Sequence, residues 1–228
     1  MKTTVRVLLI GSAGRMGQTI VNVAKGDPGI DVVALCDIGD PIEPAISCCD
    51  VAIDFSHADA IDGICQAALQ NRKPVVIGTT GHSPEQRQKI EHAAEVIPFV
   101  FAANFSVGVN ALFWLTRKAA AMLGGEFNPQ IIETHHKMKK DAPSGTAKTL
   151  AEILKRSRGS DAEIPIQSTR QGKVVGDHTI IFTGPGERLE LTHRASTREI
   201  FARGALRAAQ WVLGRPPRLY TMQDVLGL

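Results

Sequence analysis

The chain of 228 residues is 43% hydrophobic and 21% charged, and its formal net charge is +3. This charge is too small to indicate binding to nucleic acid or to a membrane surface, and no apolar stretch approaches the roughly 20 residues of a membrane helix. The length allows one large domain or two smaller ones, so we expect an ordinary soluble protein with a well-buried core.

The cysteines all lie in the first third of the chain, and their spacing matches neither a zinc site nor a redox pair. They are Cys36, Cys48, Cys49 and Cys65. The N-terminal region has no signal-peptide pattern, because Arg6 and Gly11 interrupt its apolar run. Reduced thiols without an export signal predict a cytoplasmic protein.

An apolar run over residues 5–10 predicts a strand that is buried on both faces. A glycine-rich turn and a helical pattern follow, and a second strand over residues 30–36 ends at Asp37. The turn consists of Gly11, Ser12, Ala13, Gly14, Arg15, Met16 and Gly17. In this order of elements the helix N-terminus binds a diphosphate and Asp37 accepts hydrogen bonds from a ribose. The pattern predicts a dinucleotide site, although Ala13 replaces its middle glycine and a βαβ turn without a ligand is the alternative.

Three further strands, over residues 51–55, 74–77 and 98–101, alternate with helical patterns. The alternation predicts a Rossmann-type, doubly wound parallel sheet of the α/β class. Residues 56–59 and 83–86 resemble capping boxes that open two of the helices. Loops of small residues follow the last two strands and would line the sheet edge where a cofactor binds. These loops are Gly78-Thr79-Thr80-Gly81 and Ala102-Ala103-Asn104-Phe105.

Residues 133–146 combine a cluster of cationic or titratable side chains with the start of a helix. The cluster consists of His135, His136, Lys137, Lys139 and Lys140. Ser144 stands where the helix N-cap is expected, so the stretch predicts a site for a small molecule with one or two carboxylates. A solvated basic loop is the alternative. Neighbouring strand residues face opposite sides and no third ligand is suitably spaced, so we expect no metal at the two histidines.

The rest of the chain predicts a smaller α+β domain with an open mixed sheet. A long helix over residues 109–123 precedes the basic stretch, and a last helix is expected over residues 200–213. The predicted strands cover residues 163–169, 178–183 and 188–194, with turns at 171–172, 176–177 and 184–186.

Five segments of the chain resemble the 4-hydroxy-tetrahydrodipicolinate reductase (dihydrodipicolinate reductase) family. They are residues 11–17, 76–81, 101–110, 133–146 and 186–195, in the family's order. The resemblance implies an NAD(P)H-dependent oxidoreductase of lysine and diaminopimelate biosynthesis. Such an enzyme transfers a hydride to a cyclic dicarboxylate, which loses a hydroxyl group as water.

The same resemblance implies roles for particular residues. His135 would be the general acid/base and Lys139 a proton donor, which agrees with the need for a group that titrates near neutrality. The substrate carboxylates would contact His136, Ser144, Gly145 and Thr146. The nicotinamide and its ribose would lie against Gly78, Thr79, Thr80, Ala102, Ala103, Asn104 and Phe105.

Ile38 bears on the choice of cofactor. Many family members carry a basic residue directly after the acidic residue of the second strand, where it meets the 2′-phosphate of NADPH. Ile38 occupies that place here, and His57 stands where some members have arginine. We therefore predict NADH as the preferred cofactor, with NADPH as the alternative.

The resemblance also implies two domains and a homotetramer. The dinucleotide-binding domain would comprise residues 1–105 and 198–228, and the substrate-binding domain, residues 106–197, would form the tetramer through its open sheet. Two other functions stay open: a nucleotide-sensing module without catalysis, and a related amino-acid dehydrogenase. The first gives no reason for the cluster in residues 133–146, and the second would lack the turn over residues 141–146.

Overall fold

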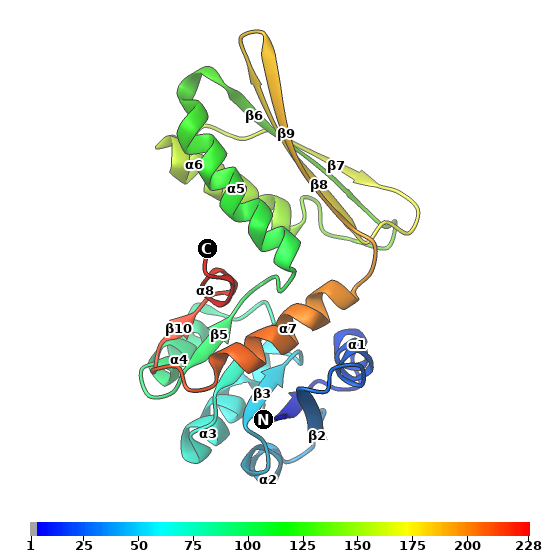
Figure 1. Cartoon of the computed structure of the whole chain (residues 1–228), viewed down its shortest axis with the longest axis vertical. Coiled ribbons are helices and arrows are strands. Elements are labelled where there is room, and N and C mark those ends of the chain that lie inside the picture. The colour runs from blue at the N-terminus through cyan, green and yellow to red at the C-terminus, as the bar shows by residue number, and fades with distance from the viewer. Residues whose placement is uncertain (1–3) are drawn as a thin grey trace. The chain divides into compact units, whose positions relative to one another are not determined.

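The computed structural model describes residues 4–228. Residues 1–3 lie outside the described residues. They are the start of the first predicted domain and part of the N-terminal segment in which no signal peptide was expected. The chain divides into two compact units (Figure 1). The first runs up to Ser106 and resumes over Glu199–Leu228, and the second is Val107–Arg198. No helix within residues 4–228 is long and apolar enough to cross a membrane.

The first unit contains a parallel sheet with the strand order β10-β5-β4-β3-β1-β2. Its strands are β1 (Val5–Ile10), β2 (Ile30–Cys36), β3 (Val51–Asp54), β4 (Val75–Ile77), β5 (Phe99–Phe101) and β10 (Leu219–Tyr220). Its α-helices are α1 (Arg15–Ala24), α2 (Ile42–Ser47), α3 (Ile61–Asn71), α4 (Pro84–Ala94), α7 (Glu199–Val212) and α8 (Met222–Leu226). The predicted doubly wound parallel sheet is confirmed.

Apolar residues on both faces of the central strands explain why this sheet forms. Leu9 belongs to a core shared with α1 and α7, whereas its neighbour Leu8 belongs to a second core shared with α3 and α4. Because successive side chains of a strand point to opposite faces, a nearly continuous apolar run requires cover on both sides. The helices supply that cover, so a ligand can reach this sheet at the ends of its strands.

The strand order reverses between β1 and β3, which lie side by side and parallel in the sheet: β2 lies on one side of β1, and β3, β4 and β5 follow on the other. This is the switch point at which α/β sheets bind ligands beyond the carboxyl ends of their strands. The loops after β1, β4 and β5 all start from that edge, because the strands are parallel. The glycine turn and both small-residue loops predicted from the sequence therefore lie along one edge of the sheet.

Of the two capping boxes predicted in this unit, one is present and the other is not. The predicted capping box at Ser83 is present, with Gln86 as its partner, and it opens α4. Ser56 opens no helix, because its hydroxyl donates instead to the buried carboxylate of Asp54 at 2.5 Å. A short 3-10 turn, Ala58–Ala60, intervenes before α3. The short elements α2, β10 and α8 have too few residues to show a periodicity and were not predicted.

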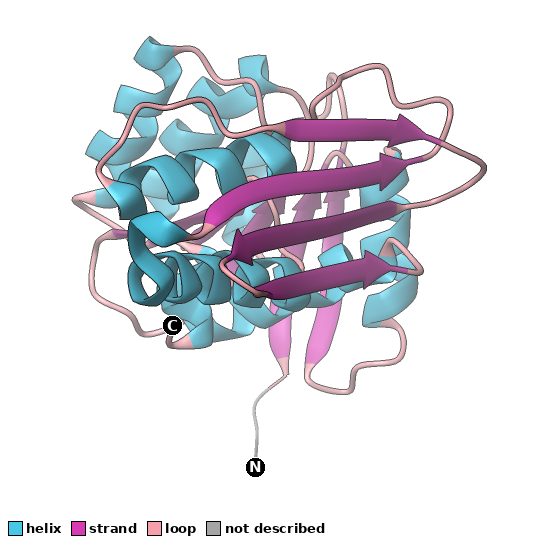
Figure 2. Ribbon diagram, turned by 90° about the horizontal axis from the view of Figure 1, so that it is seen from above, coloured by secondary structure: helices cyan, strands magenta, loops and turns pink. Residues whose placement is uncertain are grey.

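The second unit contains a mixed sheet with the order β7-β6-β8-β9. Its strands are β6 (Asn128–His135), β7 (Ile166–Arg170), β8 (Gly176–Gly184) and β9 (Glu187–Ala195), with β6 and β7 parallel and the other pairs antiparallel. The helices α5 (Val107–Leu123) and α6 (Gly145–Arg158) pack on one face of this sheet. Figure 2 shows its other face without a covering helix. The open mixed sheet predicted for this part of the chain is confirmed.

Gly176 corrects one expectation. The sequence suggested a turn at residues 176–177, but both residues belong to β8 and pair with β9. A Cβ atom at Gly176 would lie 3.0 Å from Nε2 of His135. The glycine is therefore needed to make room for a neighbouring imidazole and not to turn the chain.

Gly204→Ala should destabilise the first unit strongly. An added Cβ would lie 1.8 Å from the carbonyl oxygen of Phe105, so α7 would have to move away from the end of β5. We expect a loss of about 1–3 kcal/mol, or more, in the free energy of unfolding, measured by chemical denaturation. Gly63→Ala is the control, because nothing lies within 4 Å of its Cβ on α3, and it should be neutral or stabilising. Equal effects of the two substitutions would contradict this packing.

Candidate active site

The turn after β1 has the geometry that the dinucleotide prediction requires. Gly11 has a φ of +82°, and a Cβ there would lie 2.4 Å from the carbonyl oxygen of Phe55. Gly14 is the N-cap of α1, and Gly17 packs against the carbonyl of Gly11, which a Cβ would approach to 2.2 Å. A side chain is thus excluded at Gly11 and at Gly17, and a helix N-terminus so closely packed can present its N–H groups to an anion.

Asp37 is oriented by this same turn. Its Oδ2 accepts a hydrogen bond from the backbone N–H of Ala13 at 2.6 Å and a longer one from Ser12 Oγ at 3.5 Å. The hydrogen bond from Ala13 lowers the pKa of Asp37, so this carboxylate stays ionised. The side chain of Ile38 beside it is almost fully exposed, at 97%. Arg15 and Met16 begin α1, and Arg15 is exposed.

The other two predicted cofactor loops lie near Phe55, which the sequence analysis did not select. A Cβ at Gly78 would lie 2.3 Å from the Phe55 ring, and the rings of Phe55 and Phe105 are 5.8 Å apart. Thr79 and Phe105 are buried, whereas Thr80 and Ala103 are exposed. Ala102 and Asn104 are half-buried. The predicted cofactor residues therefore gather at one edge of the sheet, with Phe55 packed among their loops.

The second group of predicted residues lies at the end of β6. His135 is the last residue of this strand and is only 6% exposed, whereas its neighbour His136 is half-buried. Ser144 caps α6 as predicted, because its Oγ accepts the backbone N–H of Ala147 at 3.2 Å. Gly145 is exposed and Thr146 half-buried in the first turn of that helix. The histidines and the helix N-terminus thus belong to one local structure.

The lysines of the basic stretch differ in their surroundings. Lys139 is mostly buried, with 23% of its side chain exposed, and its Nζ lies 2.8 Å from Asp141. Lys137 and Lys140 are exposed to solvent. The structure therefore singles out Lys139 as the ammonium group with a fixed position, while the two others resemble the solvated loop that was the alternative.

Glu133 connects these elements and was missed from the sequence. Its carboxylate is fully buried and accepts hydrogen bonds from the Ser144 N–H at 3.1 and 3.2 Å. Ser168 Oγ and Arg170 donate to the same group at 2.7 and 3.1 Å. Burial alone would raise the pKa of Glu133, but these hydrogen bonds together outweigh it and lower the pKa, so the group is a carboxylate.

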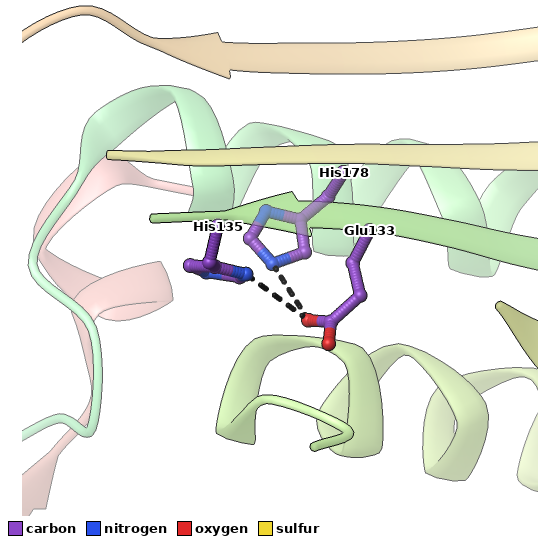
Figure 3. Close-up of side chains that lie close together, drawn as sticks. All are labelled: Glu133, His135 and His178. Carbon is purple, nitrogen blue, oxygen red and sulfur yellow. Dashed lines mark ion pairs between the residues drawn. The ribbon is translucent and has the colours of Figure 1, made fainter. Parts of the chain in front are cut away.

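Two imidazoles point toward this carboxylate (Figure 3). Nδ1 of His135 lies 3.4 Å and Nε2 of His178 lies 3.8 Å from Oε2 of Glu133. The two rings meet edge to face, 5.0 Å apart, and His178 Nε2 also shares a hydrogen bond with Ser144 Oγ at 3.2 Å. Burial, and then the neighbouring His135, lowers the pKa of His178 to about 4, so His178 is neutral at neutral pH.

Burial, cations and anions all act on the pKa of His135. Burial lowers its pKa most, and the nearby cations Lys139 and Arg170 lower it further, while Glu133 and Asp141 oppose them. The free protein therefore holds His135 mainly neutral at neutral pH. A bound anion would favour its protonated form.

Glu133, His135 and His178 have the ligand types of a metal site, and their nearest ligand atoms lie within 4.8 Å of one another. Arg170 already pairs with the carboxylate of Glu133 at 3.1 Å, so the guanidinium compensates this charge without a metal ion. A further dication beside Arg170 and Lys139 would meet repulsion. We therefore keep the prediction that this site works without a metal.

Comparison with known protein families shows to which family this chain belongs. The family "Dihydrodipicolinate reductase, N-terminus" matches residues 5–105, and "Dihydrodipicolinate reductase, C-terminus" matches residues 108–226. The chain belongs to the dihydrodipicolinate reductase family. Membership confirms the resemblance and the prediction of an NAD(P)H-dependent oxidoreductase.

Relatives of this family match the chain over nearly its full length. The 4-hydroxy-tetrahydrodipicolinate reductase of Akkermansia muciniphila is 51% identical and covers 98% of both chains. The enzyme of the same name from Geobacter metallireducens is 40% identical over 98% of this chain and 99% of its own. Both alternatives from the sequence, the sensing module and the amino-acid dehydrogenase, are therefore not favoured.

Solved structures agree with this result. A dipicolinate-bound dihydrodipicolinate reductase from Paenisporosarcina sp. TG-14 superposes with a TM-score of 0.85 and 26% identity, covering 97% of this chain and 99% of its own. The DAP dehydrogenase of C. glutamicum reaches a TM-score of only 0.62 at 12% identity, over 98% of this chain and 94% of its own. The second likeness concerns the fold alone.

Proposed function

We propose that the protein reduces 4-hydroxy-tetrahydrodipicolinate to tetrahydrodipicolinate and water, with NADH or NADPH, in lysine and diaminopimelate biosynthesis. The observation that carries the proposal is the joining of a buried histidine to a capped helix N-terminus at the end of β6. His135 and Ser144 both contact the carboxylate of Glu133. This arrangement offers a proton donor directly beside a binding site for carboxylates.

The substrate carboxylates would bind at the N-terminus of α6. Gly145 and Thr146 lie in the first turn of this helix, and the backbone N–H groups of a helix N-terminus point toward a bound anion. The helix dipole favours a negative charge at this end, and His136 and Lys139 add cationic or donor groups nearby. The dipicolinate-bound relative supports this assignment, because dipicolinate is also a ring with two carboxylates.

The cofactor would bind along the carboxyl edge of the parallel sheet. Its diphosphate would meet the N-terminus of α1, and Asp37 would accept hydrogen bonds from the adenosine ribose. Gly78, Thr79 and Thr80, with Ala102 to Phe105, would hold the nicotinamide and its ribose. When bound, the reduced nicotinamide supplies the hydride that replaces the ring hydroxyl of the substrate in the net reaction.

The chain itself must supply a proton, because the departing hydroxyl leaves as water. His135 can donate from Nε2, since its Nδ1 is buried against Glu133. Lys139 carries further protons and is held in place by Asp141.

A simple assay tests the function. The preceding synthase makes the substrate from aspartate semialdehyde and pyruvate, and the absorbance of the reduced nicotinamide reports its oxidation. Absence of oxidation with both NADH and NADPH would overturn the proposal.

His135→Gln and Lys139→Ala should lower kcat, each by about 100-fold or more, because each removes a proton donor. Lys139→Ala should lose at least as much as His135→Gln. Steady-state kinetics would separate kcat from KM, and most of the loss should lie in kcat. Lys140→Ala is the matched control, since it removes an exposed ammonium group from the same loop. Full activity in both test variants would show that the roles are assigned wrongly.

The pH dependence should differ between kcat/KM and kcat. Burial keeps the pKa of His135 below its ordinary value in the free protein. Proton donation requires the protonated form, so kcat/KM should fall as the pH rises through this lowered pKa. Bound dianion favours protonation, so the corresponding fall in kcat should occur at higher pH. Profiles from about pH 5 to about pH 8 would show the separation.

His92→Gln provides a control for these profiles, because His92 is an exposed histidine of the first unit whose ring pairs with Glu95. This variant should reproduce the wild-type curves. Curves of kcat and kcat/KM that fall at the same pH, or that rise with pH throughout, would rule out His135 as the acid.

NADH should be the preferred cofactor. Asp37 is ionised and would repel a 2′-phosphate, and exposed Ile38 beside it offers no cation to bind one. We expect a lower KM for NADH than for NADPH, and a reversed or weakened preference in Ile38→Arg. Val96→Arg adds the same charge at an exposed residue just before β5, at the opposite ends of the strands, and should change nothing. A strong preference of the wild type for NADPH would refute this assignment.

We expect the protein to form a homotetramer in the cytoplasm. The open face of the second sheet carries Ile132 and Ile181 among threonines, and Thr179 and Thr192 share a hydrogen bond across it at 3.0 Å. A second copy could cover such a face. The cysteines are all free thiols, which suits a reducing compartment. Sedimentation that gives a monomer at all protein concentrations would exclude the tetramer.

A further inference from the structure

Glu133 occupies a position where a charge is unexpected. Residues 129, 131, 133 and 135 of β6 are all buried and point to the same face of the sheet, and the first two are Pro129 and Ile131. A carboxylate in such a place costs several kcal/mol unless hydrogen bonds compensate it. Neither strand formation nor the binding of a substrate carboxylate calls for an acid here. The residue therefore needs another explanation.

The hydrogen bonds of Glu133 leave one acceptor position unused. A carboxylate offers about four acceptor positions, two on each oxygen. Oε1 accepts from Ser168 and Arg170, and the Ser144 N–H lies between both oxygens. Nδ1 of His135 is buried and has no hydrogen-bond partner within residues 4–228, and it lies 3.4 Å from Oε2 in an ion-pair contact. His178 Nε2 is farther, at 3.8 Å, and shares a hydrogen bond with Ser144.

The partners of Glu133 also hold the surrounding segments. Arg170 donates to the backbone carbonyls of Lys139 and Asp141 in the loop before α6. His178 restricts rotation of the His135 ring, because it packs against its side, edge to face. The carboxylate of Glu133 therefore contacts His135 and the N-terminus of α6 directly, and it contacts the loop of residues 139–141 through Arg170.

We propose that Glu133 is a positioning residue, which holds His135 as the Nδ1–H tautomer and fixes its ring relative to the first turn of α6. The inference rests on the proposed function, in which His135 donates the proton. With Nδ1–H directed at Glu133, Nε2 is the nitrogen that releases and regains a proton, and the carboxylate stabilises the imidazolium form.

All charged or titratable groups around His135 enter its titration. They come from β6, the loop after it, β7 and β8, and they are Glu133, Lys139, Asp141, Arg170 and His178. Glu133 and Asp141 are the anions of this set. Asp141 is largely exposed and pairs with Lys139, so Glu133 is the buried anion that favours a protonated His135.

Glu133→Gln tests the proposal, with Glu152→Gln as a control for loss of an exposed carboxylate on α6. Wild-type activity is measured first, because its absence would refute the proposed function and not the role of Glu133. We expect kcat of Glu133→Gln to fall roughly 10- to 100-fold. The pH at which its kcat declines should move down, because the protonated imidazole loses its anion. Glu133→Asp, which keeps the charge, should restore the wild-type pH of this decline. A folded Glu133→Gln with wild-type kcat and pH profile would overturn the inference.

A second measurement does not depend on the folding of that variant. Ring-nitrogen NMR of the wild type, with the His135 signals identified by their loss in His135→Gln, reports which nitrogen of the neutral ring carries the proton. We expect Nδ1–H, the less common tautomer of free histidine in water. Observation of Nε2–H would overturn the proposal even if Glu133→Gln does not fold.

Discussion

The second unit depends on one buried carboxylate, Glu133, whose charge must be compensated by hydrogen-bond donors. Glu133 is fully buried on the helix-covered face of the sheet, and its charge is acceptable only while donors surround it. Those donors come from α6, from Ser168 on β7 and from Arg170 at the end of β7. Displacement of any one of these elements would leave a buried charge incompletely compensated. The strand ends and the helix N-terminus are therefore held together more firmly than apolar packing alone would hold them.

This constraint links stability to chemistry. The contacts that keep Glu133 ionised are the same contacts that bring His135 to the N-terminus of α6. His135 and the N-terminus of α6 are thereby held in one local structure, and groups that are oriented in advance need little binding energy to orient them. The low pKa of His178 fits this arrangement, because a second imidazolium beside His135 would compete for the same anion.

The structure of the first unit depends on close contacts between backbone segments. Gly11 and Gly17 pack where side chains would collide, and Phe55 fills the space between neighbouring loops. The DAP dehydrogenase of C. glutamicum shares the fold at only 12% identity over 98% of this chain, so the fold alone does not fix the reaction. The histidines and the capped helix to which we assign the substrate lie in the second unit.

The sequence by itself determined the parallel sheet, the mixed sheet, the N-cap at Ser144 and the family, because these depend on local periodicity, capping and contiguous motifs. It could not reveal Glu133 as the centre of the site. Glu133 lies opposite His178 on one side and Ser168 on the other, and His135 lies opposite Arg170. These neighbours come from separate strands and meet only through the register of the sheet. Only the tertiary structure decided which groups surround His135, because burial and charge at that point come from residues distant in the chain.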